Sequence, residues 1–450
     1  MTNNNTIGEL GLENLMSRAN IIFTNGYKFC GKLNIDNLQQ SFINIVDSIA
    51  KFQHQLHSKS QNNYQWQTAG PFKQRFLVVE SENIEDEFKS ICSRSFDIIK
   101  QSNHFPMVMV VIVEKQEPEK DSTAQKNFII AQLSNHTYVD AGSSEVIFNQ
   151  IVNYYNSLSK QDDQKTEAIL EAAKNIKTID TQSMLDLLKK ENFEHQKNVD
   201  QLGNYPIADI GEHKVPLDTI PLCLESYKKR IRKPIVQLFN IDLLIQRCRN
   251  SNPDLSRNSI ICAAIAKGMY DLNVEIKGKS KEHIISFKML SNLLPEEMKP
   301  YYSGNYIAFV PVTVNGHESL EEIANDIQAR VTEFKQTQLN LSLFGLVEDA
   351  VQASAVGEAD EEISFIVTSW NNYSFMNNKD YLTNCDSITH YSGVNIEPKD
   401  TLGGSLVNRP VMVISLSPDG RLCLSYFPSL RSDLETQQIA KQMDKIFNRL

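Results

Sequence analysis

Two apolar runs in the first third of the chain predict buried strands. Residues 106–113 read Pro-Met-Val-Met-Val-Val-Ile-Val, and residues 128–133 read Phe-Ile-Ile-Ala-Gln-Leu. Short runs that are apolar at nearly every position are typical of strands buried on both faces of a sheet. The polar residues 114–126 between them predict a hairpin connection. An earlier stretch, residues 21–31, is also expected to be extended.

Apolar residues at steps of three and four predict amphipathic helices. One is expected to begin near Asp36, a suitable N-cap residue, and its buried face would consist of Leu38, Phe42, Ile45, Ile49 and Phe52. The same spacing predicts a helix after residue 142, with one stripe made of Ile147, Ile151, Tyr154 and Leu158. A third such helix is expected to end the chain, with a core face of Ile439, Met443, Ile446, Phe447 and Leu450.

The second half of the chain repeats this mixture after a polar stretch. Residues 159–216 are rich in Lys, Asp, Gln and Glu, which predicts a partly helical crossover. Strands are expected at 235–240, 306–314, 363–367, 411–416 and 422–427, helices at 241–249 and 256–272, and a hairpin turn at 418–420. We therefore predict the α/β class, with two similar lobes of mixed sheet covered by helices. The expected divisions are an N-terminal lobe at 1–175, a crossover linker at 176–215 and a C-terminal lobe at 216–450.

Composition and charge narrow the class of protein. The 450 residues are 41% hydrophobic and 22% charged, which is typical of a globular protein. The formal charge of −10 disfavours generic nucleic-acid binding. The seven cysteines are scattered without CxxC spacing, so neither a disulfide framework nor a zinc site is expected. No apolar run approaches the roughly 20 residues of a membrane span. We expect a soluble, cytoplasmic, metal-free monomer.

Candidate chemistry lies directly after the second apolar run. His136 and Asp140 are separated by three residues in an expected loop between a buried strand and a helix. A neutral imidazole, with an ordinary pKa of roughly 6.5, can accept a proton near neutral pH, so His136 is a candidate general base. A pair with this spacing also arises by chance in a chain with nine histidines. The strand-loop-helix setting is what favours a functional interpretation.

Three segments in the same order resemble a known family. Residues 128–142, Pro300-Tyr-Tyr-Ser-Gly-Asn305 and Val367-Thr-Ser-Trp370 are similar to segments of the HxxxD acyltransferases of the chloramphenicol-acetyltransferase-like fold. The resemblance is to the BAHD and trichothecene-acetyltransferase type, which is related to condensation domains. It implies two lobes with a tunnel between them, acyl-CoA as co-substrate and a small-molecule acceptor as partner. It further implies that His136 is the catalytic base and that Asp140 is a structural brace.

The chain also departs from the family's pattern. The arginine that braces Asp140 in the family is expected at the position of Lys288, which lacks the planar two-pronged grip of a guanidinium. Glycine follows at 142 instead of 141. The family's DFGWG motif is absent after Trp370, so Ser369, Trp370 and Asn371 are only local candidates for stabilising an oxyanion. We place Ser369 and Trp370 in the expected acyl-CoA site.

A basic run at residues 227–234 is a candidate for binding the phosphates of CoA. It contains Lys229, Arg230 and Arg232 and is the densest cluster of positive charge in the sequence. A solvated sheet edge is an equally good interpretation.

The sequence therefore predicts an acyl-CoA-dependent O- or N-acyltransferase with no permanently bound cofactor. One alternative is a free-standing condensation-type enzyme that takes the acyl group from a carrier protein. Asn135 disfavours it, because condensation domains normally carry a second histidine there. The other alternative is a binding protein that keeps the fold without catalysis, which the missing DFGWG and Lys288 would explain. The sequence does not indicate the acceptor.

Overall fold

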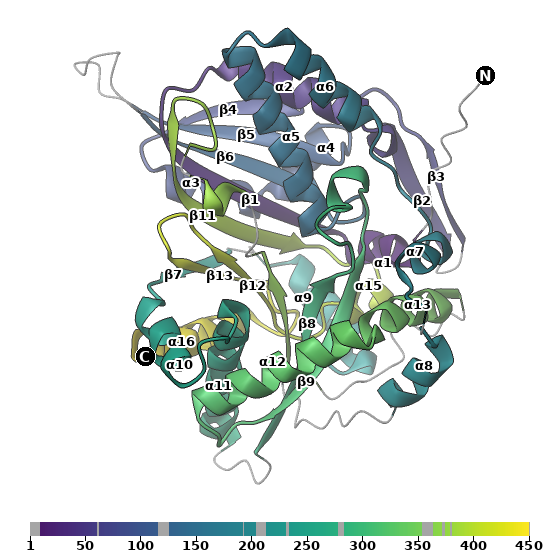
Figure 1. Cartoon of the computed structure of the whole chain (residues 1–450), viewed down its shortest axis with the longest axis vertical. Coiled ribbons are helices and arrows are strands. Elements are labelled where there is room, and N and C mark those ends of the chain that lie inside the picture. Colours follow the sequence, from purple (N-terminus) through teal and green to yellow (C-terminus); the bar gives the residue numbers. More distant parts are fainter. Residues whose placement is uncertain are drawn as a thin grey trace.

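Two mixed sheets, each covered by helices, make up the protein (Figure 1). The computed structural model describes residues 10–60, 63–115, 126–191, 193–203, 213–230, 234–277, 283–352, 363–370, 374–378 and 380–449. In the view of Figure 1 the first sheet lies above the second, and strand β11 runs along the boundary. This arrangement confirms the predicted α/β class with two helix-covered lobes.

The first sheet has five strands in the order β11-β1-β6-β5-β4. They are β11 (Cys385–Ile396), β1 (Ile21–Gly31), β6 (Lys126–Asn135), β5 (Met107–Glu114) and β4 (Phe76–Ser81). The two apolar runs are β5 and β6, which pair antiparallel as predicted. Alternate residues of β5 enter different cores, because side chains alternate between the two faces of a strand. One face packs on α2 (Ile35–Ser48) and α5 (Ala141–Ser159), the other on α3 (Ile84–Ser93) and α4 (Ser95–Gln101).

The second sheet has six strands in the order β7-β13-β12-β10-β8-β9. They are β7 (Ile235–Phe239), β13 (Leu422–Tyr426), β12 (Val411–Leu416), β10 (Phe365–Ser369), β8 (Ile284–Asn292) and β9 (Ile307–Asn315). Strand β10 runs parallel to β8 and β12, and the other pairs are antiparallel. Covering helices are α10 (Asp242–Ser251), α11 (Arg257–Lys277), α12 (Leu320–Gln336) and α16 (Asp433–Arg449). The predicted turn at 418–420 does join β12 to β13.

Strand β11 departs from the simple division of the chain at residue 216. It lies in the predicted C-terminal lobe by sequence, yet it pairs with β1 of the first sheet from Ile396 opposite Ile21 to Cys385 opposite Gly31. It also contacts β12 and β13 of the second sheet. This strand is not among those predicted from the sequence, and its pairing with β1 appears only in the tertiary structure. Strand β11, which lies in the second half of the chain, thus belongs to the first sheet and connects the two lobes.

Helix α2 begins at Ile35, close to the predicted position, but the predicted N-cap residue is wrong by two positions. Asn34, not Asp36, is the N-cap residue, and its side-chain oxygen accepts the N–H of Asn37 at 3.0 Å. Both residue types suit this position, so composition alone does not separate them. The last predicted helix is α16, in which Ile439, Met443 and Phe447 are buried, while Leu450 lies outside the described residues.

Shorter elements complete the two lobes. They are α1 (Gly11–Ala19), η1 (Ala50–Gln53), β2 (His54–Ser60), β3 (Asn63–Thr68), α6 (Asp163–Lys174), α7 (Thr181–Leu188), α8 (His195–Gly203), η2 (Leu217–Thr219), α9 (Ile220–Lys228), η3 (Lys299–Tyr301), α13 (Leu339–Gln352), α14 (Ser374–Asn377) and α15 (Thr401–Ser405). Helices α7 and α8 belong to the predicted crossover and pack on α13. In the ranges described above, no helix has both the length and the apolar character needed to span a membrane.

Candidate active site

The loop that carries His136 and Asp140 connects β6 to α5. Strand β6 ends at Asn135, and the N–H of His136 continues the pairing by donating to Ile21 O of β1 at 2.9 Å. Asp140 is the N-cap residue of α5, and its Oδ1 accepts the N–H of Ser143 at 2.7 Å. The strand-loop-helix setting that the sequence predicts is therefore present. A short loop fixed at both ends holds its side chains in defined positions.

The imidazole of His136 is held by Asn305 of the second lobe. His136 Nδ1 lies 2.8 Å from Asn305 Oδ1, and Asn305 Nδ2 donates to His136 O at 2.8 Å and to Thr137 O at 3.4 Å. Because the amide nitrogen faces two carbonyls, the amide oxygen must face the ring, and it can only accept. The proton of the neutral ring therefore sits on Nδ1, which leaves Nε2 free to accept a proton.

Burial lowers the pKa of His136 below its ordinary value, while the nearby Asp140 and the hydrogen bond to Asn305 act in the opposite direction. The ring is half-buried and lines a cavity. Phe23 of β1 packs edge-on against it, with ring centroids 5.2 Å apart. A neutral imidazole with an unprotonated Nε2 at a cavity wall has the chemistry of a general base.

Asp140 ties the two lobes together through the backbone. Its Oδ2 accepts the N–H of Tyr306 at 3.1 Å, and its own N–H donates to Gly304 O at 3.0 Å. Burial raises the pKa of Asp140, while the N–H donors and His136 lower it. Backbone N–H groups of Ser143 and Tyr306 thus brace the Asp140 carboxylate. The ammonium of Lys288, which stands where the family's arginine is expected, lies 5.2 Å from the ring centroid of Phe309.

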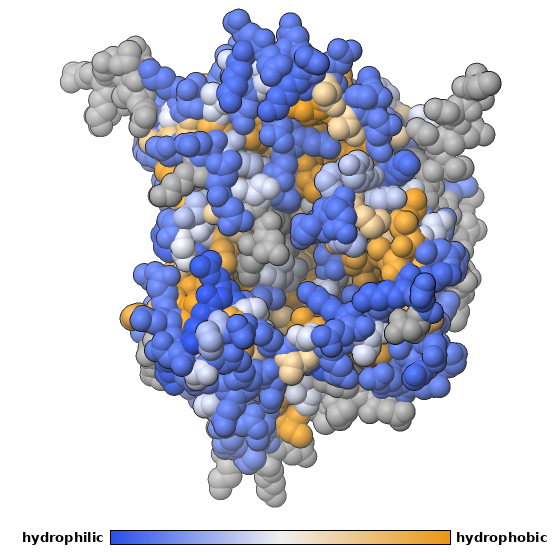
Figure 2. All heavy atoms as spheres, in the orientation of Figure 1, coloured by the Kyte–Doolittle hydropathy of each residue, from blue (hydrophilic) through white to orange (hydrophobic). Residues whose placement is uncertain are grey.

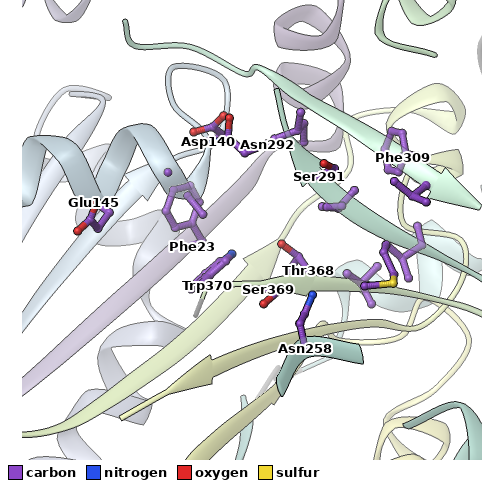
Figure 3. A pocket seen from close by; sticks show the side chains of 18 of the residues that line it. Phe23, Asp140, Glu145, Asn258, Ser291, Asn292, Phe309, Thr368, Ser369 and Trp370 are labelled. Carbon is purple, nitrogen blue, oxygen red and sulfur yellow. The ribbon is translucent and has the colours of Figure 1, made fainter. Parts of the chain in front are cut away.

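A cavity of about 750 Å³ lies between the two lobes. Figure 3 shows its wall: Phe23 of β1 lies beside Trp370, Asp140 lies beside Asn292, and Ser291, Thr368 and Ser369 come from the ends of β8 and β10. Phe23 links the two sides, since its ring centroid lies 5.6 Å from that of Trp370. This volume is in the range of sites that bind small molecules. Figure 2 shows a mostly hydrophilic face in which apolar residues appear in recesses.

The other lining residues are mainly apolar. They include Met16, Ile21, Met289, Leu290, Leu294, Ile307, Phe309, Val310, Ile366, Val394, Leu406, Val407, Val411, Leu416 and Phe427. A β-carbon at Gly142 would lie 2.6 Å from Asn292 Nδ2. Glycine at 142 therefore leaves room for the Asn292 side chain of β8 beside the start of α5.

Positive charge reaches the cavity from residues that the sequence analysis missed. Arg257 at the start of α11, Lys299 of η3 and Lys335 near the end of α12 all line it. Lys299 is paired with Glu296, while Arg257 and Lys335 are exposed. These residues lie far apart in the sequence, so no basic run indicates them.

The described residues of the predicted basic run do not line the cavity. Arg230 donates to Ser429 O and Leu430 O, both at 2.9 Å, and pairs with Asp433 at 3.2 Å. Neither Arg230 nor the exposed Lys229 lines the cavity. Arg230 thus serves to hold the residues before α16. Arg232 and Asn371 lie outside the described residues.

Among the residues in the described ranges, no group of three or more His, Cys, Asp or Glu could hold a metal ion.

Comparison with known proteins identifies the fold. No family model matches the chain, and no curated protein matches it. Among solved structures, the TRI3 trichothecene 15-O-acetyltransferase from Fusarium sporotrichioides is similar with a TM-score of 0.63 and 10% identity, over 97% of this chain and 93% of that one. The chain has the fold of these acyltransferases.

Two further structures carry bound ligands. F. sporotrichioides TRI101, complexed with coenzyme A and T-2, has a TM-score of 0.57 and 10% identity over 93% of this chain and 94% of its own. A starter condensation domain of rhizomide synthetase, in complex with C8-CoA, has a TM-score of 0.55 and 11% identity over 94% and 89%. Acetyltransferases and condensation domains thus share this fold over nearly the whole chain.

Proposed function

We propose that the protein is an acyltransferase of the HxxxD type that transfers an acyl group from acyl-CoA to a hydroxyl or amine. The observation that carries the proposal is His136 at the wall of the cavity between the lobes, with its Nδ1 facing Asn305 Oδ1. The fold shared with acetyltransferases supports the same class of reaction.

In the proposed reaction, Nε2 of His136 removes the proton of the acceptor as the acceptor oxygen or nitrogen attacks the thioester carbonyl. A tetrahedral oxyanion forms and then collapses, and the carbon–sulfur bond breaks. The proton on His136 passes to the departing CoA thiolate, which restores the neutral base. No acyl-enzyme is formed, and the base accounts for about 10²- to 10⁴-fold of the rate.

The oxyanion requires hydrogen-bond donors on the opposite wall. Ser369 and Trp370, at the end of β10, bring a hydroxyl and an indole N–H to the cavity. We assign them this role in place of the missing DFGWG residues.

The phosphates of CoA require positive charge. Arg257 and Lys335 are exposed cations of the cavity lining and are the best candidates. They replace Lys229 and Arg230 in this role, because Arg230 is held by the residues before α16. CoA acts here as a co-substrate and not as a resident cofactor.

Replacement of the base tests the proposal. Pools of acyl-CoA thioesters and acceptors are screened by mass spectrometry for acylated product, and CoA release is followed with a thiol reagent. His136→Ala should lower the rate by at least about 100-fold. The exposed pair of His283 and His317 beside Tyr270 offers a control, and His317→Ala should leave the rate unchanged. A wild-type rate in His136→Ala would refute the mechanism.

A condensation-type enzyme is the second candidate, and the similarity to the starter condensation domain favours it. Asn135 argues against it, since β6 ends there without a second histidine. Turnover with an acyl-carrier protein but not with acyl-CoA would decide for condensation. Binding of CoA without any turnover would indicate a binding protein of this fold.

A further inference from the structure

A buried ion pair lies behind the loop that carries His136. Glu13 of α1 and Lys51 of η1 are 0% and 2% exposed, and the Lys51 ammonium bonds directly to the Glu13 carboxylate. Lys51 Nζ also lies 5.1 Å from the ring centroid of Trp66. Buried lysine and glutamate are rare, and removing both from water costs free energy that their attraction only partly offsets. The pair is therefore expected to add little to the free energy of unfolding, which suggests another role for it.

The pair touches the His136–Asp140 loop at its midpoint. Lys51 Nζ donates to Tyr138 O at 2.9 Å. Tyr138 N–H in turn donates to Asn135 O at 3.0 Å, which closes the turn around His136. The lysine thus fixes the peptide group midway between the imidazole and the carboxylate of Asp140.

The charge of Glu13 also responds to the residue that holds the imidazole. The backbone N–H of Asn305 lowers the pKa of Glu13 and so favours the carboxylate form. The side chain of Asn305 bonds His136 Nδ1 and His136 O. The pair therefore contacts the loop directly through Lys51 and interacts electrostatically with Asn305 of the second lobe.

The electrostatic setting couples these groups. Burial raises the pKa of Glu13 to about 7 and lowers the pKa of Lys51, and each partner opposes the shift of the other. Asp140 acts on both residues. The negative charge of Glu13 also raises the pKa of Tyr138 and of Tyr306. Removing either member of the pair therefore changes the electrostatic environment of Tyr138 within the loop.

We propose that Glu13 and Lys51 form a positioning pair that holds the His136–Asp140 loop so that Nε2 of His136 faces the reacting atoms. The inference rests on the proposed function, because it assigns the pair to the orientation of the catalytic base. A displacement of about 1 Å in such a base can cost on the order of 100-fold in rate. Neither residue lines the cavity, so the pair acts through the loop and not on a substrate.

The double variant Glu13→Gln/Lys51→Met tests the pair without leaving a single buried charge. We expect kcat to fall about tenfold or more, while KM for acyl-CoA stays within about twofold. The control is Lys28→Met/Glu85→Gln, which removes a pair of β1 and α3 on the same lobe, away from the cavity. It should keep the wild-type kcat.

A second measurement does not depend on turnover. Nitrogen NMR of the histidine side chains, with His136 assigned by its loss in His136→Ala, should show the proton on Nδ1 in the wild type. The double variant should lose this single tautomer. If circular dichroism shows that the double variant does not fold, Glu13→Asp replaces it. Glu13→Asp keeps the charge but retracts it by one methylene, and it should lower kcat with the same loss of the tautomer.

Wild-type kcat together with an unchanged tautomer in the folded variant would overturn the inference. The absence of turnover in the wild type would refute the proposed function instead. The nitrogen spectra would then still decide whether the pair positions the ring.

Discussion

Replacement of Asn305 by alanine gives the most specific test of the site. Asn305→Ala removes the acceptor that faces His136 Nδ1 and the donor that faces His136 O, both at 2.8 Å. Each bond is worth about 1 kcal/mol, so the favoured orientation and tautomer of the ring lose about 2 kcal/mol. A difference of 1.4 kcal/mol is a factor of ten. We expect kcat to fall roughly 30-fold, with little change in KM for acyl-CoA.

Steady-state release of CoA, followed across a range of acyl-CoA concentrations, measures both constants. Thermal unfolding of the same samples measures the accompanying loss of stability, which should be similar in size. Asn315→Ala provides the control, because Asn315 lies exposed at the far end of β9. If Asn305→Ala loses stability but keeps kcat within about twofold of the wild type, the amide supports the fold and does not orient the base.

Further predictions concern charge and hydrogen bonding at the site. Burial lowers the pKa of His136, and only the neutral ring can accept a proton. As the pH falls, kcat/KM should therefore decline only below the ordinary pKa of histidine. A decline that begins above that pKa would contradict the proposed role of His136. Asp140→Ala should cost about 2–4 kcal/mol of unfolding free energy in urea, from a lost helix cap and an unpaired buried N–H; a loss under 1 kcal/mol would refute the brace. Arg257→Ala and Lys335→Ala should each raise KM for acyl-CoA several-fold while kcat stays constant, and the rise in KM should be smaller at high salt. Arg230→Ala should lower the midpoint of thermal unfolding without changing KM. Equal KM values in all three variants would refute the assignment of Arg257 and Lys335 to the phosphates.

Local pattern predicted the elements near His136 well. The apolar runs that became β5 and β6 and the helical spacing within α5 depend on neighbouring residues, because the backbone periods of strand and helix set which positions are buried. The placement of His136 and Asp140 at the end of β6 follows from the same local signals. The N-cap of α2 was missed because Asn34 and Asp36 offer the same local chemistry, and only the path of the chain selects between them.

The contacts that give the site its chemistry join residues far apart in the chain. Asn305 lies 169 residues from His136, and Lys51 lies 38 residues from Glu13. Hydrophobic periodicity cannot predict such pairs, because it indicates only which side of a helix or strand is buried. For the same reason the sequence favoured the contiguous basic run 227–234 and overlooked Arg257 and Lys335. The amino-acid order thus determined many of the elements and the position of His136 at the end of β6, whereas the packing of the two lobes, joined by β11, decided which groups hold the imidazole and which charges face the cavity.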